Sequence, residues 1–296
     1  MTVLKSLDTS TPADGTPGLV RRPRKRGSLG LHVLLAVAAL TWLIPIIWML
    51  SMALTPNEVL QKSSTSLFPS AVTFDNFVTV LRGSELPRWF LNSAVVSIVT
   101  TVVTVLFCAM AGYAFARISF RGKRLVFAAV LAGLMVPKEA MFIPLFLMIS
   151  SADLQNSYPA LILPRLAAPL GVFLMTQFFS KVPPELEEAA RIDGATRWRT
   201  FSSIMVPLAR PAMASLAIFT FVLTWNDYLW PLVASTRTEW FTITTGLASL
   251  QSNFASATNL GDLMARGLIG SLPLIIVFFV FQRQLIRGIT LGSGEK

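Results

Sequence analysis

A polar segment in the second half of the chain reads Glu188-Ala189-Ala190, three residues, Gly194, nine residues, Ile204, two residues, Pro207. It lies between two long apolar runs, and its residues favour helix. In a chain that is otherwise so apolar, a polar segment of this length is typical of a surface that contacts a soluble partner. We therefore expect residues 181–211 to form a loop outside the lipid that docks on another protein.

The order of residues in this loop predicts two short helices with a bend between them. The Pro-Pro pair at 183–184 suits a helix start, because the N–H that proline lacks would have no helical partner there. Glutamates follow in the first turn and complement the positive end of the helix dipole. Gly194 can adopt the positive φ that ends a helix, and Thr196 can cap the next one. Two further prolines, Pro207 and Pro211, are expected to mark the entry into the following apolar run.

An alternative is an amphipathic linker that lies on the lipid surface. Its basic residues Arg191, Arg197 and Arg199 would suit anionic headgroups. The acidic first turn argues against a lipid contact, and this alternative leaves the spacing of the segment unexplained. We therefore favour docking on a protein.

Composition places the chain in a membrane. Of its 296 residues, 53% are hydrophobic and only 14% are charged, whereas soluble domains carry about a quarter charged residues. Apolar runs recur, each near the roughly 20 residues that cross a bilayer. They predict an all-α integral membrane protein with six transmembrane helices, at Gly30–Met52, Trp89–Phe115, Leu125–Ile149, Pro159–Phe179, Pro211–Val233 and Leu263–Phe281.

The formal net charge of +10 follows from where lysine and arginine are placed. An even number of spans puts both termini on one side of the membrane. On that side lie 18 of the 25 basic residues, in the tails 1–29 and 283–296 and in the loops 116–124 and 181–211. Basic loops favour the cytoplasm, so we expect both termini to be cytoplasmic in a multi-pass protein of the inner (plasma) membrane. The charge therefore requires no nucleic-acid partner.

Several chemistries are excluded by what the chain lacks. With one cysteine, Cys108, and one histidine, His32, it has no disulfide framework and no multi-cysteine metal site. No Gly-x-x-x-x-Gly-Lys-Ser/Thr phosphate loop is present, so ATP is not bound by this chain. No catalytic residue is predicted, which disfavours an intramembrane enzyme. A structural membrane scaffold is a further alternative, and it would differ from a transporter in stimulating no ATPase.

Ionisable residues inside spans are candidates for function, because burying a charge is costly unless it is paired or hydrated. Lys138 and Glu139 lie between two prolines that are expected to kink the third span. At 1.5 Å per residue, Arg165 and Asp227 come level in the outer third of the fourth and fifth spans. They could pair with each other or line a translocation path together with Asn226. The aromatic neighbours favour the path, since a sugar needs polar and apolar faces.

The polar segment resembles the EAA loop of ABC importer permeases, except that Val206 stands where leucine is usual. The whole chain from about Leu31 to Gly292 resembles the second permease subunit of maltose-type carbohydrate importers. The resemblance is carried by residues 183–195, by residues 221–232 and by the closing segment 281–292. The family often ends in Gly-Ala-Val-Lys-Gly, whereas this chain ends in Gly-Ser-Gly-Glu-Lys.

The resemblance implies a type I ABC importer permease fold and a set of partners. These are a second permease subunit, two cytoplasmic ATP-binding subunits that hold ATP and magnesium, and an extracytoplasmic solute-binding protein. From its residues, the chain is expected to divide into a disordered, basic cytoplasmic tail (1–29), a six-span permease domain (30–282) and a cytoplasmic C-terminal tail (283–296). The residues that the resemblance assigns to ATPase coupling are Glu188, Ala189, Ala190, Asp193, Gly194, Ile204 and Pro207.

The solute implied by the resemblance is a carbohydrate. A glycerol phosphate or another polyol-derived solute is the alternative within transport, because some members of this permease group carry such solutes and the basic residues Lys138 and Arg165 would suit an anion.

Overall fold

The computed structural model describes residues 28–62, 68–69, 71–251 and 259–292. Helices joined by turns make up this described part, which contains no strand. Residues 1–46 and 47–296 form two compact units, and each is described by itself. Residues 1–27 and 293–296 of the two predicted tails lie outside the described part.

Four stretches of helix in the described residues are long and apolar enough to cross a membrane. They are α1 (Ser28–Ala53), α4 (Leu86–Arg117), the stretch Arg197–Trp225 and the first part of α14 (Leu260–Gly292). Two pairs of shorter helices pass the same test as bent spans, which gives up to six spans. The prediction of an all-helical membrane protein is confirmed.

Helix α1 forms the described part of the first unit and continues into the second. Its residues 30–46 all have exposed side chains, although nearly all of them are apolar. A helix that is apolar all round is stable only when lipid or other helices surround it. The predicted first span, Gly30–Met52, agrees with this helix to within two residues at each end.

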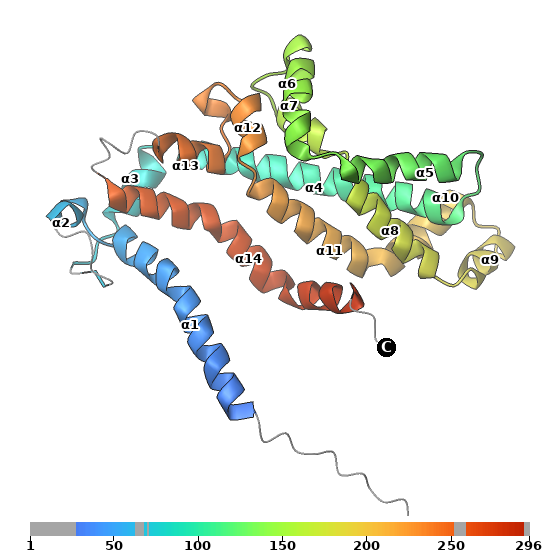
Figure 1. Cartoon of the computed structure of the whole chain (residues 1–296), viewed down its shortest axis with the longest axis horizontal. Coiled ribbons are helices and arrows are strands. Elements are labelled where there is room, and N and C mark those ends of the chain that lie inside the picture. Colours follow the sequence, from blue (N-terminus) through green and yellow to red (C-terminus); the bar gives the residue numbers. More distant parts are fainter. Residues whose placement is uncertain (1–27, 63–67, 70, 252–258, 293–296) are drawn as a thin grey trace, which may run out of the picture. The chain divides into compact units, whose positions relative to one another are not determined.

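Helix α4 is the central helix of the second unit, with α8 (Pro169–Lys181) and α11 (Val206–Trp225) packed along it (Figure 1). Gly112 permits the close approach of α4 and α8, because a Cβ there would lie 2.5 Å from the Cβ of Met175. The core that these helices share consists of Val105, Cys108, Ala109, Tyr113, Met175, Phe179, Phe201, Met205, Ala209 and Leu216.

The third and fourth predicted spans are bent rather than straight. In the third, α5 (Lys123–Ala132) and η1 (Gly133–Met135) meet η2 (Lys138–Met141) and α6 (Phe142–Ser151) at 99°. The predicted proline kink is confirmed, at Pro137. In the fourth, α7 (Tyr158–Ile162) and η3 (Leu163–Arg165) meet α8 at 48°. Pro169 begins α8, where its missing N–H is tolerated.

The fifth predicted span, Pro211–Val233, differs from the structure at both ends. Helix α10 (Arg197–Thr200), the π-helical segment η4 (Phe201–Met205) and α11 follow one another without a break. The prediction that two prolines mark the entry into this span is confirmed for Pro207 and wrong for Pro211. Pro207 stands in the first turn of α11, where it is tolerated, and Pro211 lies inside the helix. Helix α11 ends at Trp225, and α12 (Leu229–Ala234) follows after a turn.

Four more helices gather near the N-terminal ends of α4 and α14. They are α2 (Asn57–Lys62), α3 (Asp75–Arg82), η5 (Thr238–Trp240) and α13 (Ile243–Gln251). A second core joins α3, α4, α11, α13 and α14 through Val80, Trp89, Trp225, Ile243 and Ala265. The indole of Trp225 donates a hydrogen bond to the carbonyl oxygen of Gly270, 3.0 Å away, which fixes the end of α11 against α14.

Candidate functional site

The predicted loop 181–211 is a helical hairpin whose bend has a defined geometry. Helix α9 (Glu185–Ile192) ends at Gly194, which has a φ of +75°. The N–H of Gly194 donates to the carbonyl of Arg191 (3.1 Å), and the N–H of Ala195 donates to that of Ala190 (2.9 Å). These two bonds form a Schellman motif. Thr196 then caps α10 by accepting from the N–H of Arg199 at 3.3 Å. Both local predictions for the bend are confirmed.

The residues predicted for ATPase coupling fall on two sides of the hairpin. Glu188, Ala189, Asp193 and Gly194 are exposed. Ala190 is buried, while Ile204 and Pro207 are half-buried at the base of the hairpin. The motif therefore contains both residues that are exposed on the hairpin surface and residues that pack in its interior.

The base of the hairpin is attached to the C-terminal end of α4. Arg117 forms an ion pair with Glu187 of α9, with Nε and Oε1 3.4 Å apart. It also donates a hydrogen bond to the carbonyl of Val182, which precedes α9. Only 14% of each side chain in the ion pair is exposed, so solvent screens the pair less than it screens a surface pair.

Aromatic packing adds a second attachment. Tyr113 of α4 packs against Phe179 of α8 and Phe201 of η4, with ring centroids 5.8 and 5.2 Å apart. Met205 is fully buried in the same core. The second helix of the hairpin is thus part of the transmembrane core. A force on the hairpin would reach α4, α8 and α11.

The structure brings together two of the five residues predicted for the translocation path. Arg165 at the end of η3 forms an ion pair with Asp227 in the turn after α11, and about 20% and 19% of their side chains are exposed. Thr244 donates a hydrogen bond to the backbone carbonyl of Asp227 at 2.6 Å. Of the two predicted arrangements, the structure therefore shows the one in which Arg165 and Asp227 pair with each other.

The other three residues are not joined to this pair. The side-chain amide of Asn226 donates to the carbonyl of Val222 at 3.0 Å, and the residue is exposed. Lys138 and Glu139 lie in η2 after the 99° bend and are exposed. Among the described residues, neither forms a hydrogen bond or an ion pair through its side chain.

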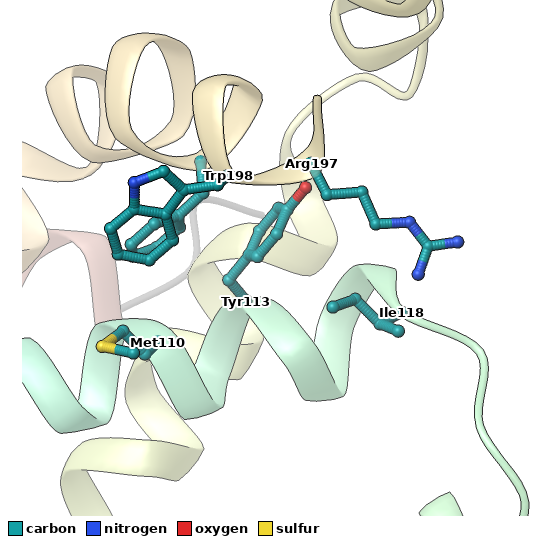
Figure 2. A pocket seen from close by; sticks show the side chains of 6 residues that line it. Met110, Tyr113, Ile118, Arg197 and Trp198 are labelled. Atoms are coloured by element: carbon teal, nitrogen blue, oxygen red, sulfur yellow. The ribbon is translucent and has the colours of Figure 1, made fainter. Parts of the chain in front are cut away.

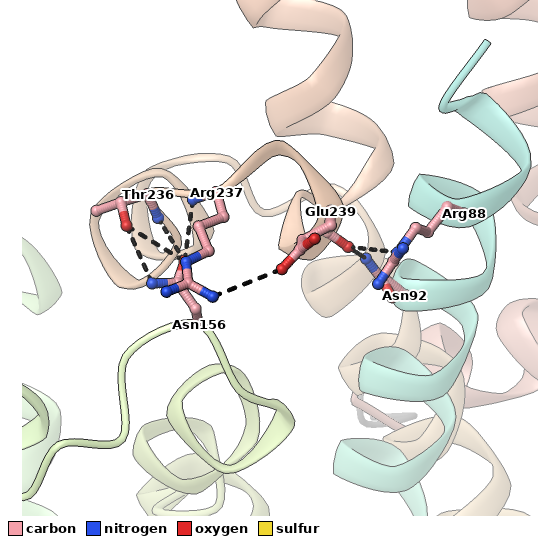
Figure 3. Close-up of polar contacts among 6 residues, drawn as sticks. All are labelled: Arg88, Asn92, Asn156, Thr236, Arg237 and Glu239. Atoms are coloured by element: carbon pink, nitrogen blue, oxygen red, sulfur yellow. Dashed lines mark hydrogen bonds and ion pairs between the residues drawn. The ribbon is translucent and has the colours of Figure 1, made fainter.

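At its N-terminal end, α4 holds a polar network that ties two loops together (Figure 3). Asn92 donates to the carbonyls of Glu239 (2.9 Å) and Phe241 (3.0 Å). Its side-chain oxygen accepts from the hydroxyl of Tyr158 at 2.9 Å. Asn156 accepts from the backbone N–H groups of Thr236 and Arg237 at 2.8 and 3.0 Å. The loops before α7 and α13 are therefore fixed to the same helix that holds the hairpin.

Sequence reasoning missed three residues of this site. The sequence indicates Arg117 only as a basic loop residue and Glu187 only as an acid in the first turn of a helix. The two are 70 residues apart, so no local pattern predicts their ion pair. Ile192 is 86% exposed at the end of α9. An exposed apolar residue three positions after Ala189 and four after Glu188 lies on the same helix face and is a signal for a contact surface.

Comparison with known proteins identifies the family. The model of the family described as "Binding-protein-dependent transport system inner membrane component" matches residues 104–291. The arabinooligosaccharides transport system permease protein AraQ of Halalkalibacterium halodurans is 39% identical over 80% of this chain and 85% of its own length. The trehalose transport system permease protein SugB of Mycobacterium tuberculosis is 34% identical over 85% of this chain and 92% of its own length.

A third relative, the lactose transport system permease protein LacG of Rhizobium radiobacter, is 34% identical over 88% of this chain and 94% of its own length. The chain belongs to the family of binding-protein-dependent transport system inner membrane components. It is a multi-pass permease subunit of an ABC importer, located in the inner membrane, and not an enzyme.

A solved structure has the same fold. The crystal structure of a bacterial ABC transporter involved in the import of the acidic polysaccharide alginate contains a chain that superimposes with a TM-score of 0.77. The match covers 86% of this chain and 95% of that one, at 24% identity. At this identity the likeness shows the fold, which is that of an importer permease.

Proposed function

We propose that this permease carries a carbohydrate, and that the hairpin 181–211 docks on a cytoplasmic ATP-binding subunit. The observation that carries the proposal is the construction of the hairpin. Exposed Glu188, Ala189 and Ile192 lie on α9, while Arg117 and the core around Phe201 hold the hairpin against the transmembrane helices. A docking element must combine an accessible surface with a stiff connection to the helices that it moves.

Helix α4 offers a direct route between the two sides of the membrane. Its 32 residues extend over about 48 Å at 1.5 Å per residue. It contacts the hairpin through Arg117 at one end and the loops before α7 and α13 through Asn92 at the other. Movement of the hairpin on ATP hydrolysis would then shift α4 and the loops together, which is the requirement for alternating access.

The proposed assembly contains this chain, a second permease, two ATP-binding subunits and an extracytoplasmic solute-binding protein. Both termini and the hairpin face the cytoplasm, in keeping with the lysine and arginine distribution. ATP and magnesium are held by the partner subunits. The membrane lipid surrounds the exposed apolar faces of α1 and the other spans.

A carbohydrate is supported by the relatives that carry arabinooligosaccharides, trehalose and lactose. The alternative of an anionic solute such as a glycerol phosphate relied on Lys138 and Arg165. In the structure the charge of Arg165 is balanced by Asp227, which weakens that alternative.

The test is to purify the assembled complex and measure its ATPase activity with loaded binding protein and a panel of solutes. The panel contains arabino-oligosaccharides, trehalose, lactose and glycerol 3-phosphate. We expect one of the carbohydrates to stimulate ATP hydrolysis and to be taken up into vesicles. Stimulation by glycerol 3-phosphate alone would contradict the carbohydrate assignment, and no coupling of uptake to ATP would contradict the proposed function.

A further inference from the structure

A pocket of about 190 Å³ lies between the C-terminal end of α4 and the second helix of the hairpin (Figure 2). Helix α4 supplies one wall, and α10 with the start of η4 supplies the other. The residues that line the pocket are Met110, Tyr113, Ile118, Arg197, Trp198 and Phe201. The proposed contact between the hairpin and the ATP-binding subunit involves none of these side chains.

The chemistry of the pocket is apolar with two hydrogen-bond donors at one end. Figure 2 shows the hydroxyl of Tyr113 directed toward the backbone of Arg197, the Arg197 guanidinium extending outward on the side of Ile118, and the ring of Trp198 on the side of Met110. The Tyr113 hydroxyl forms no hydrogen bond with any described residue. Arg197 likewise has no carboxylate at ion-pair distance in the described part of the chain. A phenol and a guanidinium can both donate to one anionic group.

The position of the pocket relates it to the membrane surface. Arg117, the last residue of α4, follows Tyr113 by about one helical turn. Three more basic residues follow in the adjoining segment, namely Arg121, Lys123 and Arg124. Trp198 is 64% exposed, and tryptophan is enriched at the level of lipid headgroups. The pocket therefore opens where a span meets a basic surface.

We propose that this pocket binds an anionic phospholipid. The phosphate accepts hydrogen bonds from the Arg197 guanidinium and the Tyr113 hydroxyl, and part of one acyl chain lies against Met110, Trp198 and Phe201. The rest of the lipid stays in the bilayer, because the pocket has room for only a segment of one chain. Charge complementarity selects an anionic headgroup, since a basic residue near the surface favours anionic lipid.

A soluble phosphate compound would leave the apolar walls unused, so a lipid is the better occupant. Bound there, the lipid contacts both α4 and the hairpin, and it would therefore influence how tightly the two pack. The inference that the lipid comes from the cytoplasmic leaflet rests on the topology given in the proposed function. The pocket and its two donors are independent of that topology.

The experiment uses the assembled complex in nanodiscs that contain a photo-crosslinkable phosphatidylglycerol or the matching phosphatidylcholine probe. Cross-linked peptides are located by mass spectrometry for the wild type, Arg197→Gln, Arg197→Lys and Arg199→Gln. Arg199 is the matched control, because it is exposed on the same helix and does not line the pocket. ATPase activity is recorded in parallel, so that a failure of coupling is seen separately from a failure of lipid binding.

We expect the phosphatidylglycerol probe to label residues 110–118 and 197–201 in the wild type. Arg197→Gln should lower that labelling by about fivefold, the factor for losing one basic contact at an anionic surface, while Arg197→Lys and Arg199→Gln retain most of it. Equal labelling by both probes, or equal losses in Arg197→Gln and Arg199→Gln, would overturn the proposal. So would the absence of labelling in the complex, because a partner protein would then fill the pocket.

Discussion

The guanidinium of Arg165 and the carboxylate of Asp227 form an ion pair that joins two interrupted helices. Arg165 ends η3, just before the 48° bend of the fourth span, and Asp227 lies two residues after Trp225, the last residue of α11. The pair thus connects two places where backbone hydrogen bonding is broken inside the membrane region. Such breaks are tolerated where protein or water satisfies the freed groups, and Thr244 does so for the carbonyl of Asp227.

The first prediction concerns this pair. We expect Asp227→Asn and Arg165→Gln each to reduce the yield of assembled complex, because each leaves a mostly buried partner without its counter-charge, at a cost of a few kcal/mol. The double variant should recover much of the yield. Yield by size-exclusion chromatography and solute uptake are the two measurements.

The control for this prediction is the exposed pair Arg237–Glu239, whose side chains are 72% and 44% exposed. Arg237→Gln should change yield little, because exposed ion pairs contribute little. If the double variant at 165 and 227 assembles but does not transport, Asp227 also acts on the solute. If both yield and uptake recover, its role is structural.

The second prediction concerns the bend of the hairpin. Gly194→Val should uncouple ATP hydrolysis from uptake, because a side chain at φ +75° is strained by about 1–2 kcal/mol or more when β-branched. A Cβ at Gly194 would meet no atom within 4 Å, so the effect is one of backbone strain alone. Gly194→Asn is the matched control, since asparagine tolerates this conformation. Equal coupling in the two variants would contradict the bent-hairpin model.

A third prediction tests the packing of α4 on α8. Gly112→Ala should lower the free energy of unfolding by about 1–3 kcal/mol, the usual cost of overpacking, because the new Cβ meets Met175 at 2.5 Å. Gly267→Ala makes the same change in α14, where the nearest atom lies at 3.6 Å, and should leave stability nearly unchanged. Thermal unfolding in detergent compares the two, and similar melting temperatures would contradict the close contact.

The fourth prediction concerns topology. Cysteines placed at Ser119, Thr196 and Ser293 should not react with a membrane-impermeant thiol reagent added to intact cells, whereas one at the exposed Glu58 should react. The native Cys108 is buried and gives little background. Ser293 lies outside the described residues and tests the C-terminal tail. Strong labelling at Thr196 from outside would contradict both the cytoplasmic hairpin and its docking role.

Much of the hairpin could be predicted because its determinants are local. A glycine at the end of α9 and a threonine before α10 specify the bend through their own backbone preferences. The proline kink in the third span has the same origin, since Pro137 removes a donor from the helix. In each case the sequence within a few residues decides the conformation.

The break after α11 could not be predicted in the same way. No proline or glycine stands between Trp225 and Leu229, so the apolar pattern indicated a helix continuing to Val233. The turn is instead held by distant residues, through Arg165 and Thr244. The ion pair of Arg117 with Glu187 is also non-local. Such contacts depend on which helices are neighbours, and the composition of one span contains no information about that.

The five-residue π-helical segment Phe201–Met205 makes the orientation of the hairpin depend on the number of residues in the chain. A π-turn holds one residue more than an α-turn, and each residue turns an α-helix by about 100°. That extra residue therefore sets the rotation of the proposed docking surface on α9 relative to the lipid-facing side of α11. Removing one residue here would leave a continuous helix and the same apolar composition, yet it would aim the exposed face of the hairpin at a different part of its partner.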